Sequence, residues 1–575
     1  MRVQFSRSRK ARQGYALMMV LGFAAISLMV LGAAMSWVDS NSRQMQRKNR
    51  SLATTAVAEG MADKVIAQMN ADFQANGGAM ASQSPSGYGT LTNQPAESEL
   101  WKQFAVDDGS GHTNQVLVQR TTNWNYGLLN TKYSVMYGSN ASYRISARIS
   151  ELGQPSNTRV SIQQDLQVAS IPIFEFAIFY GLNMEINPPA DFTVNGRVHS
   201  NGGIYAKPPA TTTFQSHVTA AGTIQLANSP NDPVSRTLGK VVYQGEHDGG
   251  VKALNLPIGA NSDANALQAL IDIPPSGESA SSLVGQQRYY NKADLVILIK
   301  ENGVVATSGA YNGFNTAVPW VQSRNIVNTN GSSLFGNGYY NFISFADYRE
   351  YSYVQSTDVD LSVLRAQYSN LTAVLGREAK TIYIADLRNQ SGYQSVVRLK
   401  NGQTLPAHGL TIATPNSLYV QGHYNAPSAQ VGTTNTTATV PASLIADAIT
   451  ILSGNWNDAN SASTSWSQRK ATATTVNAAI IAGIVPSDGS YYSGGVENFH
   501  RLLEDWTGQI LTFNGSIVAL YPSRQAVGQW GNNKYIFISP LKRNFSRDPN
   551  FLDSTKLPPG TPEVRTVIRS RWITI

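Results

Sequence analysis

The feature that most constrains this chain is an uncharged, proline-free run from Tyr15 to Val38. An α-helix of that length rises about 36 Å, which is enough to cross the hydrocarbon core of a bilayer. A secretory signal peptide has an apolar core of only about 7–15 residues, so the run is too long for an ordinary cleaved signal. No second run of this kind follows. We therefore expect one membrane-spanning helix near the start of the chain.

The net charge of the chain is concentrated on both sides of this run. The formal charge is +8, and residues 1–50 contain nine Lys or Arg residues but only one acid, Asp39. Residues 51–575 are therefore formally neutral, and this balance does not favour nucleic-acid binding by the body of the chain. A short basic leader before a large body favours a cytoplasmic N-terminus. The chain has no cysteine, which excludes disulfides, thiolate metal sites and a cysteine nucleophile.

The segment after the apolar run is expected to continue the same helix. It contains no proline before Pro85, and the Gly77-Gly78 pair is a plausible stop. We predict one helix from about Tyr15 to Asp72, half in lipid and half in water; the alternative is a span followed by an unrelated second helix. The apolar residues that recur at helical spacing in its second half are Met61, Val65, Ile66 and Met69.

This N-terminal arrangement resembles that of the type IV pilins, and most closely that of large accessory pilins with a PilX-type N-terminus. The matching elements are a short basic leader, Gly14, the aromatic Tyr15, the apolar stretch and an alanine-rich helix with Ala-Val-Ala-Glu at 56–59. The resemblance implies that a prepilin peptidase cuts after Gly14. Tyr15 then becomes the mature N-terminus, and the helix packs into a filament core with other pilins.

One position departs from the pilin pattern. Pilins usually carry a glutamate at the fifth mature position, where it pairs with a neighbour's terminal amine, but this chain has Met19 there. A buried carboxylate is costly without its partner, so its absence fits a capping subunit or a simple anchor equally well. Met19 therefore argues against a repeating shaft subunit.

The expected fold class is α+β, divided into four parts: a basic leader at 1–14, the long helix at 15–72, a pilin-like antiparallel sheet region at 73–180 and a large β-rich head at 181–575. The sheet is predicted from alternating polar and apolar residues in segments 114–120, 142–150 and 158–168.

Beyond residue 185 a pattern of apolar, any residue, glycine, any residue, apolar recurs, for example at Val194–Val198 and Phe513–Ile517. Glycine where backbones approach closely suits stacked β-rungs. We expect a solenoid-like head, with a β-sandwich containing glycine bulges as the alternative. Apolar spacing of three and four predicts short helices at 264–273, 361–370, 441–452 and 497–506.

Motifs that would define an enzyme are not found, and we expect no catalytic, cofactor-binding or metal-binding residues. The chain lacks a Walker loop, a Rossmann glycine fingerprint and the HExxH and GxSxG motifs. Asp358 and Asp360 resemble a glycosidase pair, but the cap of a following helix explains them better. The histidines near strand or glycine signals lack metal-ligand spacing and are interpreted as structural. They are His199, His217, His408 and His423.

Aromatic residues are dense between 310 and 355. They could form a stacking surface for sugars or single-stranded DNA, although a tyrosine-rich core edge is favoured. They are Tyr311, Phe314, Trp320, Phe335, Tyr339, Tyr340, Phe342, Phe345, Tyr348, Tyr351 and Tyr353.

Together these features favour a non-enzymatic accessory pilin. Such a protein sits in the bacterial inner membrane with its body in the periplasm, and then primes or caps a type IV pilus or pseudopilus. Its head would be displayed for adhesion, DNA capture or assembly. The alternatives are a membrane-anchored or secreted β-helical enzyme acting on polysaccharide, and a bitopic protein with a structural head and no filament partner.

Overall fold

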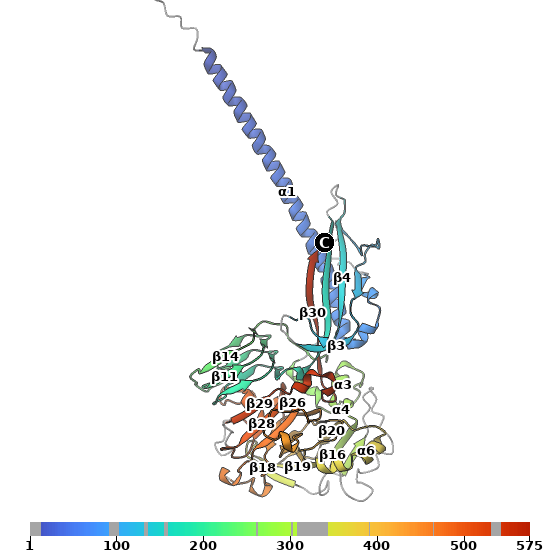
Figure 1. Ribbon diagram of the computed structural model, residues 1–575, viewed down its shortest axis with the longest axis vertical. Helices are drawn as coiled ribbons and strands as arrows, with labels where there is room; N and C mark the ends of the chain where they lie inside the picture. Colours follow the sequence, from blue (N-terminus) through green and yellow to red (C-terminus); the bar gives the residue numbers. More distant parts are fainter. Residues whose placement is uncertain are drawn as a thin grey trace, which may run out of the picture.

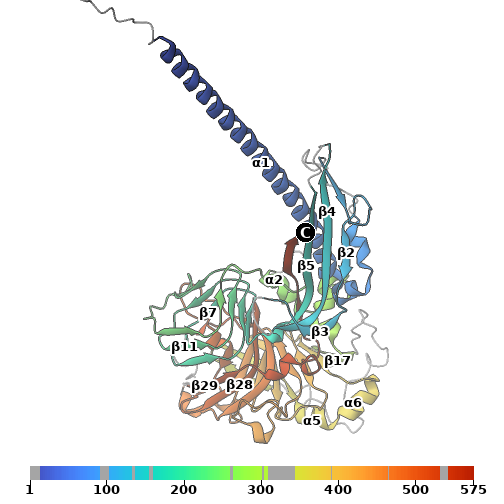
Figure 2. The ribbon, with the colours of Figure 1, turned by 45° about the horizontal axis from the view of Figure 1, so that its top comes forward.

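The computed structural model describes residues 13–575 except 91–102, 132–135, 154–158, 260–262, 301–302, 308–342, 390, 464 and 531–541. Its first element, α1 (Gln13–Asn76), is a single helix of 64 residues. It continues through residues 38–52 without a break, so the alternative of two unrelated helices is wrong. The helix ends four residues after the predicted Asp72, directly before Gly77, whose φ of 55° suits a glycine. Figures 1 and 2 show α1 projecting far beyond the rest of the molecule.

The second half of α1 packs on a six-stranded antiparallel sheet, which we call the stalk sheet. Its long central strands β4 (Tyr137–Glu151) and β5 (Arg159–Pro172) pair along most of their length. On β4 the buried residues alternate with partly exposed ones, as expected of a half-buried strand. The three short strands that pair with β4 are β1 (Phe104–Asp107), β2 (Leu117–Arg120) and β3 (Asn125–Leu128).

The sixth strand of the stalk sheet comes from the far end of the chain. Strand β30 (Glu563–Thr574) pairs antiparallel with β5, and Figure 2 shows it beside that strand. The assignment of residues 181–575 to the head is therefore corrected for β30. The sheet region also ends before residue 180, because β6 (Ile178–Tyr180) already pairs with head strands. The head is thus inserted between two adjacent strands of the stalk sheet.

The first part of the head consists of short parallel strands stacked in three ladders. Aligned residues are 20 residues apart in the first steps and 29 apart in the last step of the first and third ladders. In the first ladder Ile178, Val198 and Val218 are aligned and buried, and in the second Met184 and Ile204 are aligned and buried. The first ladder contains β6, β9 (Val198–Ser200), β12 (Val218–Ala220) and β15 (His247–Asp248). The second contains β7 (Met184–Ile186), β10 (Ile204–Ala206) and β13 (Ile224–Gln225). The third contains β8 (Phe192–Val194), β11 (Thr211–Phe214) and β14 (Lys240–Tyr243).

The second part of the head contains two facing sheets, between which the chain alternates from strand to strand. One sheet extends the first ladder through β28 (Ile510–Pro522), β26 (Thr474–Ile484), β24 (Ala442–Ala446), β22 (Leu410–Ala413), β20 (Thr381–Asp386), β16 (Leu295–Lys300) and β17 (Gly303–Thr307), with β29 (Lys542–Ser546) beside β28. The other contains β18 (Ile343–Asp347), β19 (Ser352–Asp360), β21 (Tyr393–Lys400), β23 (Ser417–Gln421), β25 (Ile449–Leu452) and β27 (His500–Leu502).

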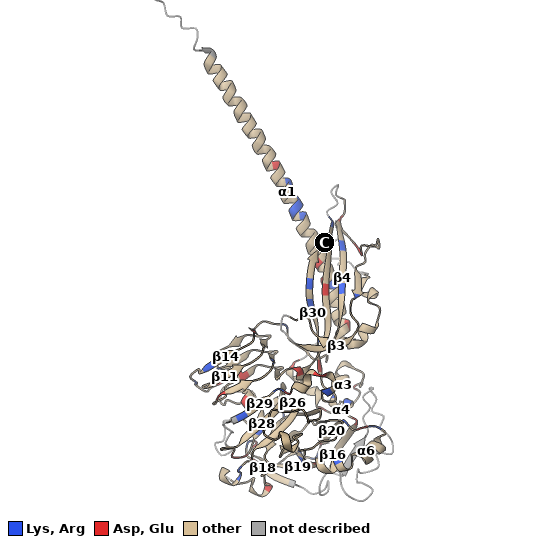
Figure 3. Ribbon diagram, viewed as in Figure 1, with Lys and Arg blue, Asp and Glu red and all other residues tan. Residues whose placement is uncertain are grey.

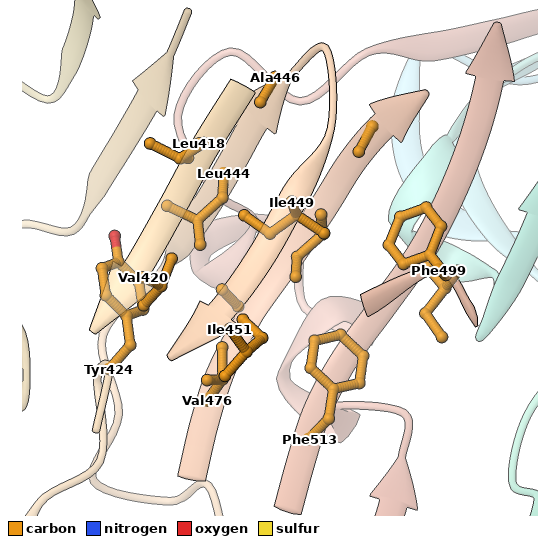
Figure 4. Packing of buried hydrophobic residues seen from close by; sticks show 14 of the residues in the cluster. Leu418, Val420, Tyr424, Leu444, Ala446, Ile449, Ile451, Val476, Phe499 and Phe513 are labelled. Carbon is orange, nitrogen blue, oxygen red and sulfur yellow. The ribbon is translucent and has the colours of Figure 1, made fainter. Parts of the chain in front are cut away.

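Parallel pairing dominates this part of the head, whereas a sandwich of hairpins would be antiparallel. Among the described strands of the two sheets, only β16–β17 and β18–β19 are antiparallel pairs. The space between the sheets is filled by buried apolar residues, including Leu444, Ile451 and Phe513 (Figure 4). Strands such as β24 and β25 are buried along their whole length, and their sequences are mostly apolar rather than alternating.

Two of the four predicted helices are present and two are wrong. Segment 264–273 begins with α2 (Ala264–Leu267), and 361–370 forms α5 (Leu361–Ala366) and the start of α6 (Tyr368–Leu375). Segment 441–452 instead forms β24 and β25, and 497–506 contains β27. In strands buried on both faces the apolar residues carry no period of two, and by chance they matched helical spacing. Two further short helices are α3 (Leu283–Gln287) and α4 (Tyr289–Lys292).

Candidate membrane and filament interface

The first half of α1 makes no packing contact with the rest of the described chain. Tyr15 is 74% exposed and Met19 is 60% exposed, and every residue from Tyr15 to Val38 is exposed. By length and composition this half is able to cross a membrane. An apolar surface of this size on a soluble protein marks a contact with lipid or with other proteins.

Gly14, Tyr15 and Met19 all lie in this exposed half. Gly14 is the second residue of α1, and Met19 follows Tyr15 by about one helical turn, so the two side chains share one face. Residues 1–12 of the predicted leader lie outside the described residues.

A band of basic residues follows the apolar half and is coloured blue on the ribbon of α1 in Figure 3. It consists of Arg43, Arg47, Lys48 and Arg50. Arg43 forms an exposed ion pair with Asp39 at 2.9 Å, and Arg47 and Lys48 are exposed as well. Charges of this kind favour water or lipid headgroups and mark the end of the segment suited to the bilayer core.

The second half of α1 is held in the stalk core. One face of the helix is buried against β4 and β5, with Val65 and Phe73 fully enclosed. The buried residues of α1 in this cluster are Val57, Ala58, Met61, Ala62, Val65, Ile66, Met69 and Phe73. These include all four apolar residues on which the helical continuation was predicted.

Polar contacts from β30 fasten the C-terminal end of the helix. The Arg565 guanidinium donates to the carbonyls of Phe73 and Gln74, and the Gln74 amide donates back to the Arg565 carbonyl at 2.9 Å. Carbonyls at a helix C-terminus lack intrahelical partners, so a cation there satisfies them and complements the helix dipole. Arg569 of β30 also pairs with Asp63 at 2.6 Å. The last strand of the chain thus helps to set the direction of the first helix.

The four candidate histidines do not converge on one site, although His199 and His217 line the same cavity. His199 bonds Thr219 at 2.8 Å and Asn201 at 2.9 Å, and burial lowers its pKa to about 4. His408 lies 2.9 Å from Glu378, and His423 accepts a hydrogen bond from the Thr475 amide at 3.1 Å. His199 and His217 line one cavity of about 170 Å³ between the stalk and the head. In the described part of the chain no three His, Asp or Glu residues are grouped as a metal site requires.

The two candidate carboxylates, Asp358 and Asp360, also have structural roles. Asp360 caps α5 by accepting from the amides of Ser362 and Val363, as the cap interpretation predicted. Asp358 instead holds Arg398, whose side chain is 1% exposed and which also binds Asp458 at 2.6 Å. The third member of this network could not be found from the sequence, because Asp458 is 60 residues from Arg398.

A buried carboxylate that the sequence did not single out is Glu175, at the junction of the stalk and the head. Its side chain is enclosed, with Arg547 at 3.9 Å. Burial raises the Glu175 pKa to about 7, against the opposing effect of Arg547 and Arg197. Its only sequence signal is a single acid within the apolar run Ile171–Tyr180.

The dense aromatic segment divides between core and surface. Phe345 is buried against Tyr419 and Trp456, as the core-edge interpretation predicted, and the Tyr348 hydroxyl donates to the Ala462 carbonyl. Tyr351 and Tyr353 are exposed. The members from Tyr311 to Phe342 lie outside the described residues.

No protein-family model matches the chain, and no curated protein matches it in sequence. Among solved structures, it is similar to the competence-associated pilin ComZ from Thermus thermophilus, with a TM-score of 0.30 and 12% sequence identity. That alignment covers 91% of this chain and 97% of the other. At this score neither fold nor function is inferred from the likeness.

Proposed function

We propose that this chain is a non-enzymatic, pilin-like accessory subunit of a type IV pilus or pseudopilus. The observation that carries the proposal is the single 64-residue helix, exposed and apolar in its first half and packed on an antiparallel sheet in its second. An apolar helix that its own chain leaves uncovered needs lipid or other helices around it. Before assembly the inner membrane fills that role, and in the filament neighbouring pilins do.

The transfer from membrane to filament follows from the chemistry of this surface. Tyr15 to Val38 carry no charge, so moving the helix from lipid into a helical bundle exchanges one set of apolar contacts for another at small net cost. The basic band beyond Val38 stays outside the bilayer core, and the stalk sheet stays in water. In this proposal a prepilin peptidase removes the leader after Gly14, and Tyr15 becomes the first residue of the assembled subunit.

Met19 supports a position at the end of a filament rather than within its shaft. Met19 offers no carboxylate to the amine of a neighbouring subunit, so a subunit stacked against this face gains no charge pair there. The head, inserted between β5 and β30, would then be displayed outward as a solenoid-like platform for adhesion, DNA capture or assembly.

The native protein provides the test. We expect its N-terminal residue to be Tyr15 and the protein to appear in the fraction sheared from the cell surface as well as in the inner membrane. A protein that starts at Met1 and is found only in membranes would overturn the filament role. A protein that starts near Trp37 and is found free in the periplasm would overturn the membrane-inserted state as well.

A matched pair of charge variants separates insertion from folding. Phe23→Lys places a charge in the exposed apolar half, whereas Ala56→Lys places the same charge at an exposed position of the second half. Only Phe23→Lys should lose membrane retention and filament incorporation. Equal retention of both variants would contradict the proposal.

A further inference from the structure

The turn between β18 and β19 holds a tyrosine in an unfavourable backbone conformation. Tyr351 has a φ of 52°, in the left-handed region that bulky residues rarely adopt, and its side chain is 57% exposed. A residue is kept in such a conformation only when its surroundings fix it, and cases of this kind cluster at binding sites.

Buried polar contacts fix this turn. The Asp347 carboxylate accepts hydrogen bonds from the amides of Arg349 at 2.8 Å and Glu350 at 3.2 Å, and from the Tyr419 hydroxyl at 2.6 Å. The Glu350 carboxylate pairs with the buried Arg501 and accepts from the Gly528 amide at 2.9 Å. The backbone of the strained residue is therefore held by a buried polar network, so little backbone ordering is needed when a ligand binds.

Two further tyrosines lie at the same end of these strands. Tyr353 is 48% exposed and follows Tyr351 by two residues. It is in register with Tyr393 on the neighbouring strand β21, and the two ring centroids are 6.2 Å apart with the planes tilted by 54°. We call Tyr351, Tyr353 and Tyr393 the tyrosine surface.

The charges around the tyrosine surface do not suit a nucleic acid. A single-stranded nucleic acid requires cations along its backbone as well as stacking rings. Within the described residues, the arginines of this turn and of the strand ends beside it are already bound: Arg349 and Arg501 are buried, and Arg388 donates to Asp386 at 2.9 and 2.6 Å. What this part of the head offers a ligand is the exposed aromatic rings of Tyr351 and Tyr353.

We propose that the tyrosine surface binds a neutral glycan, with the rings of Tyr351 and Tyr353 stacked on the apolar faces of its sugar residues. A pyranose ring presents C–H groups on one face, and these can stack on an exposed tyrosine ring without a charged partner. Figure 1 shows β18 and β19 at the end of the head remote from α1. The biological use of the site rests on the proposed function, since a head displayed outward places this end toward a surface that carries glycans.

The test measures binding to the full-length protein in detergent micelles. The probes are neutral hexasaccharides of glucose, galactose, mannose and N-acetylglucosamine, and saturation-transfer NMR reports contact while titration gives the affinity. We expect at least one hexasaccharide to bind, and the double variant Tyr351→Ala/Tyr353→Ala to bind it at least tenfold more weakly. The matched control is Tyr205→Ala, a partly exposed tyrosine on β10 in a different ladder, which should bind as the unmodified chain does.

A glycine variant separates binding from folding. Tyr351→Gly removes the ring but accepts the left-handed backbone, so its unfolding midpoint should not fall while its affinity for the hexasaccharide does. Retained affinity in this variant would overturn the assignment of Tyr351.

The remaining outcomes are equally decisive. Absence of binding to every hexasaccharide, or binding that the double variant does not weaken, would overturn the inference. Tighter binding of a dT15 oligonucleotide than of any sugar would replace it with nucleic-acid recognition. A chain that binds a hexasaccharide but never enters filaments would overturn the proposed function alone, because these assays do not depend on assembly.

Discussion

The two halves of α1 are one helix in two different surroundings. Phe23 in the first half is 68% exposed, whereas Phe73 in the second is fully buried and contacts Trp124 edge-on at 6.0 Å. Both halves carry large apolar side chains, but among the described residues only the second half packs against other parts of the chain. The difference shows that the stalk sheet accounts for the apolar face of the second half, whereas the apolar surface of the first half is left uncovered by the described residues.

We expect the largest change in stability when the two phenylalanines of this comparison are replaced in turn by alanine. Phe73→Ala should lower the free energy of unfolding by about 4 kcal/mol, because it leaves a cavity in the stalk core. Phe23→Ala removes the same atoms from an exposed site and should change it by less than about 0.5 kcal/mol. Urea unfolding of the full chain in micelles measures both. Equal losses would show that the first half of α1 also packs on the body.

A second pair of substitutions compares a buried ion-pair network in the head with a partly exposed ion pair in the stalk. In the head, Arg398→Met leaves Asp358 and Asp458 without their shared cation in a buried site, and should cost about 3 kcal/mol. In the stalk, Arg144→Met breaks a partly exposed pair with Asp165 at 2.7 Å and should cost no more than about 1 kcal/mol. Urea unfolding of both variants measures the two losses in free energy of unfolding. A larger loss for Arg144→Met than for Arg398→Met would contradict the argument that burial makes the head network the more important one.

The junction between stalk and head should show a pH dependence from Glu175. Its folded-state pKa of about 7 lies above its ordinary value of 4.5, so the folded state holds the proton longer than the unfolded state. The free energy of unfolding should therefore fall as pH rises from about 4.5 to 7 and then level off. Glu175→Gln should reduce the loss between pH 5 and pH 8 by about 2 kcal/mol. The check is thermal or urea unfolding at both pH values; an unchanged loss would place Glu175 in contact with solvent.

The sequence was most informative where one face of an element meets water. The helical spacing of Met61, Val65 and Met69 and the alternation along β4 both led to the right element, because the polar face reveals the period. Where both faces are buried, as in β24 and β25, that signal disappears. Segments 441–452 and 497–506 were therefore assigned to helices although they form strands or irregular backbone.

Long-range pairing and local strain were beyond sequence reasoning. Strand β30 pairs with β5, which lies about 400 residues earlier in the chain, and the sequence of β30 does not indicate which strand it will pair with. The acid Glu175 and the trio of Arg398, Asp358 and Asp458 come together only in the folded chain. The exposed Tyr351 was noted among the aromatics, but its left-handed backbone follows from the buried network around Asp347 and Glu350, which no local motif announces.

The continuity of α1 between its two surroundings is the central claim, and one distance measures it directly. The chain has no native cysteine, so one double variant, Ser36→Cys/Ala56→Cys, carries only two spin labels, both at exposed positions. Twenty residues of unbroken helix separate these sites by about 30 Å. Pulsed electron–electron double resonance on the full chain in lipid nanodiscs should give one narrow distribution of label-to-label distances centred near this value. A broad distribution, or one centred well below that distance, would mean that the helix breaks between membrane and stalk, and would contradict the account.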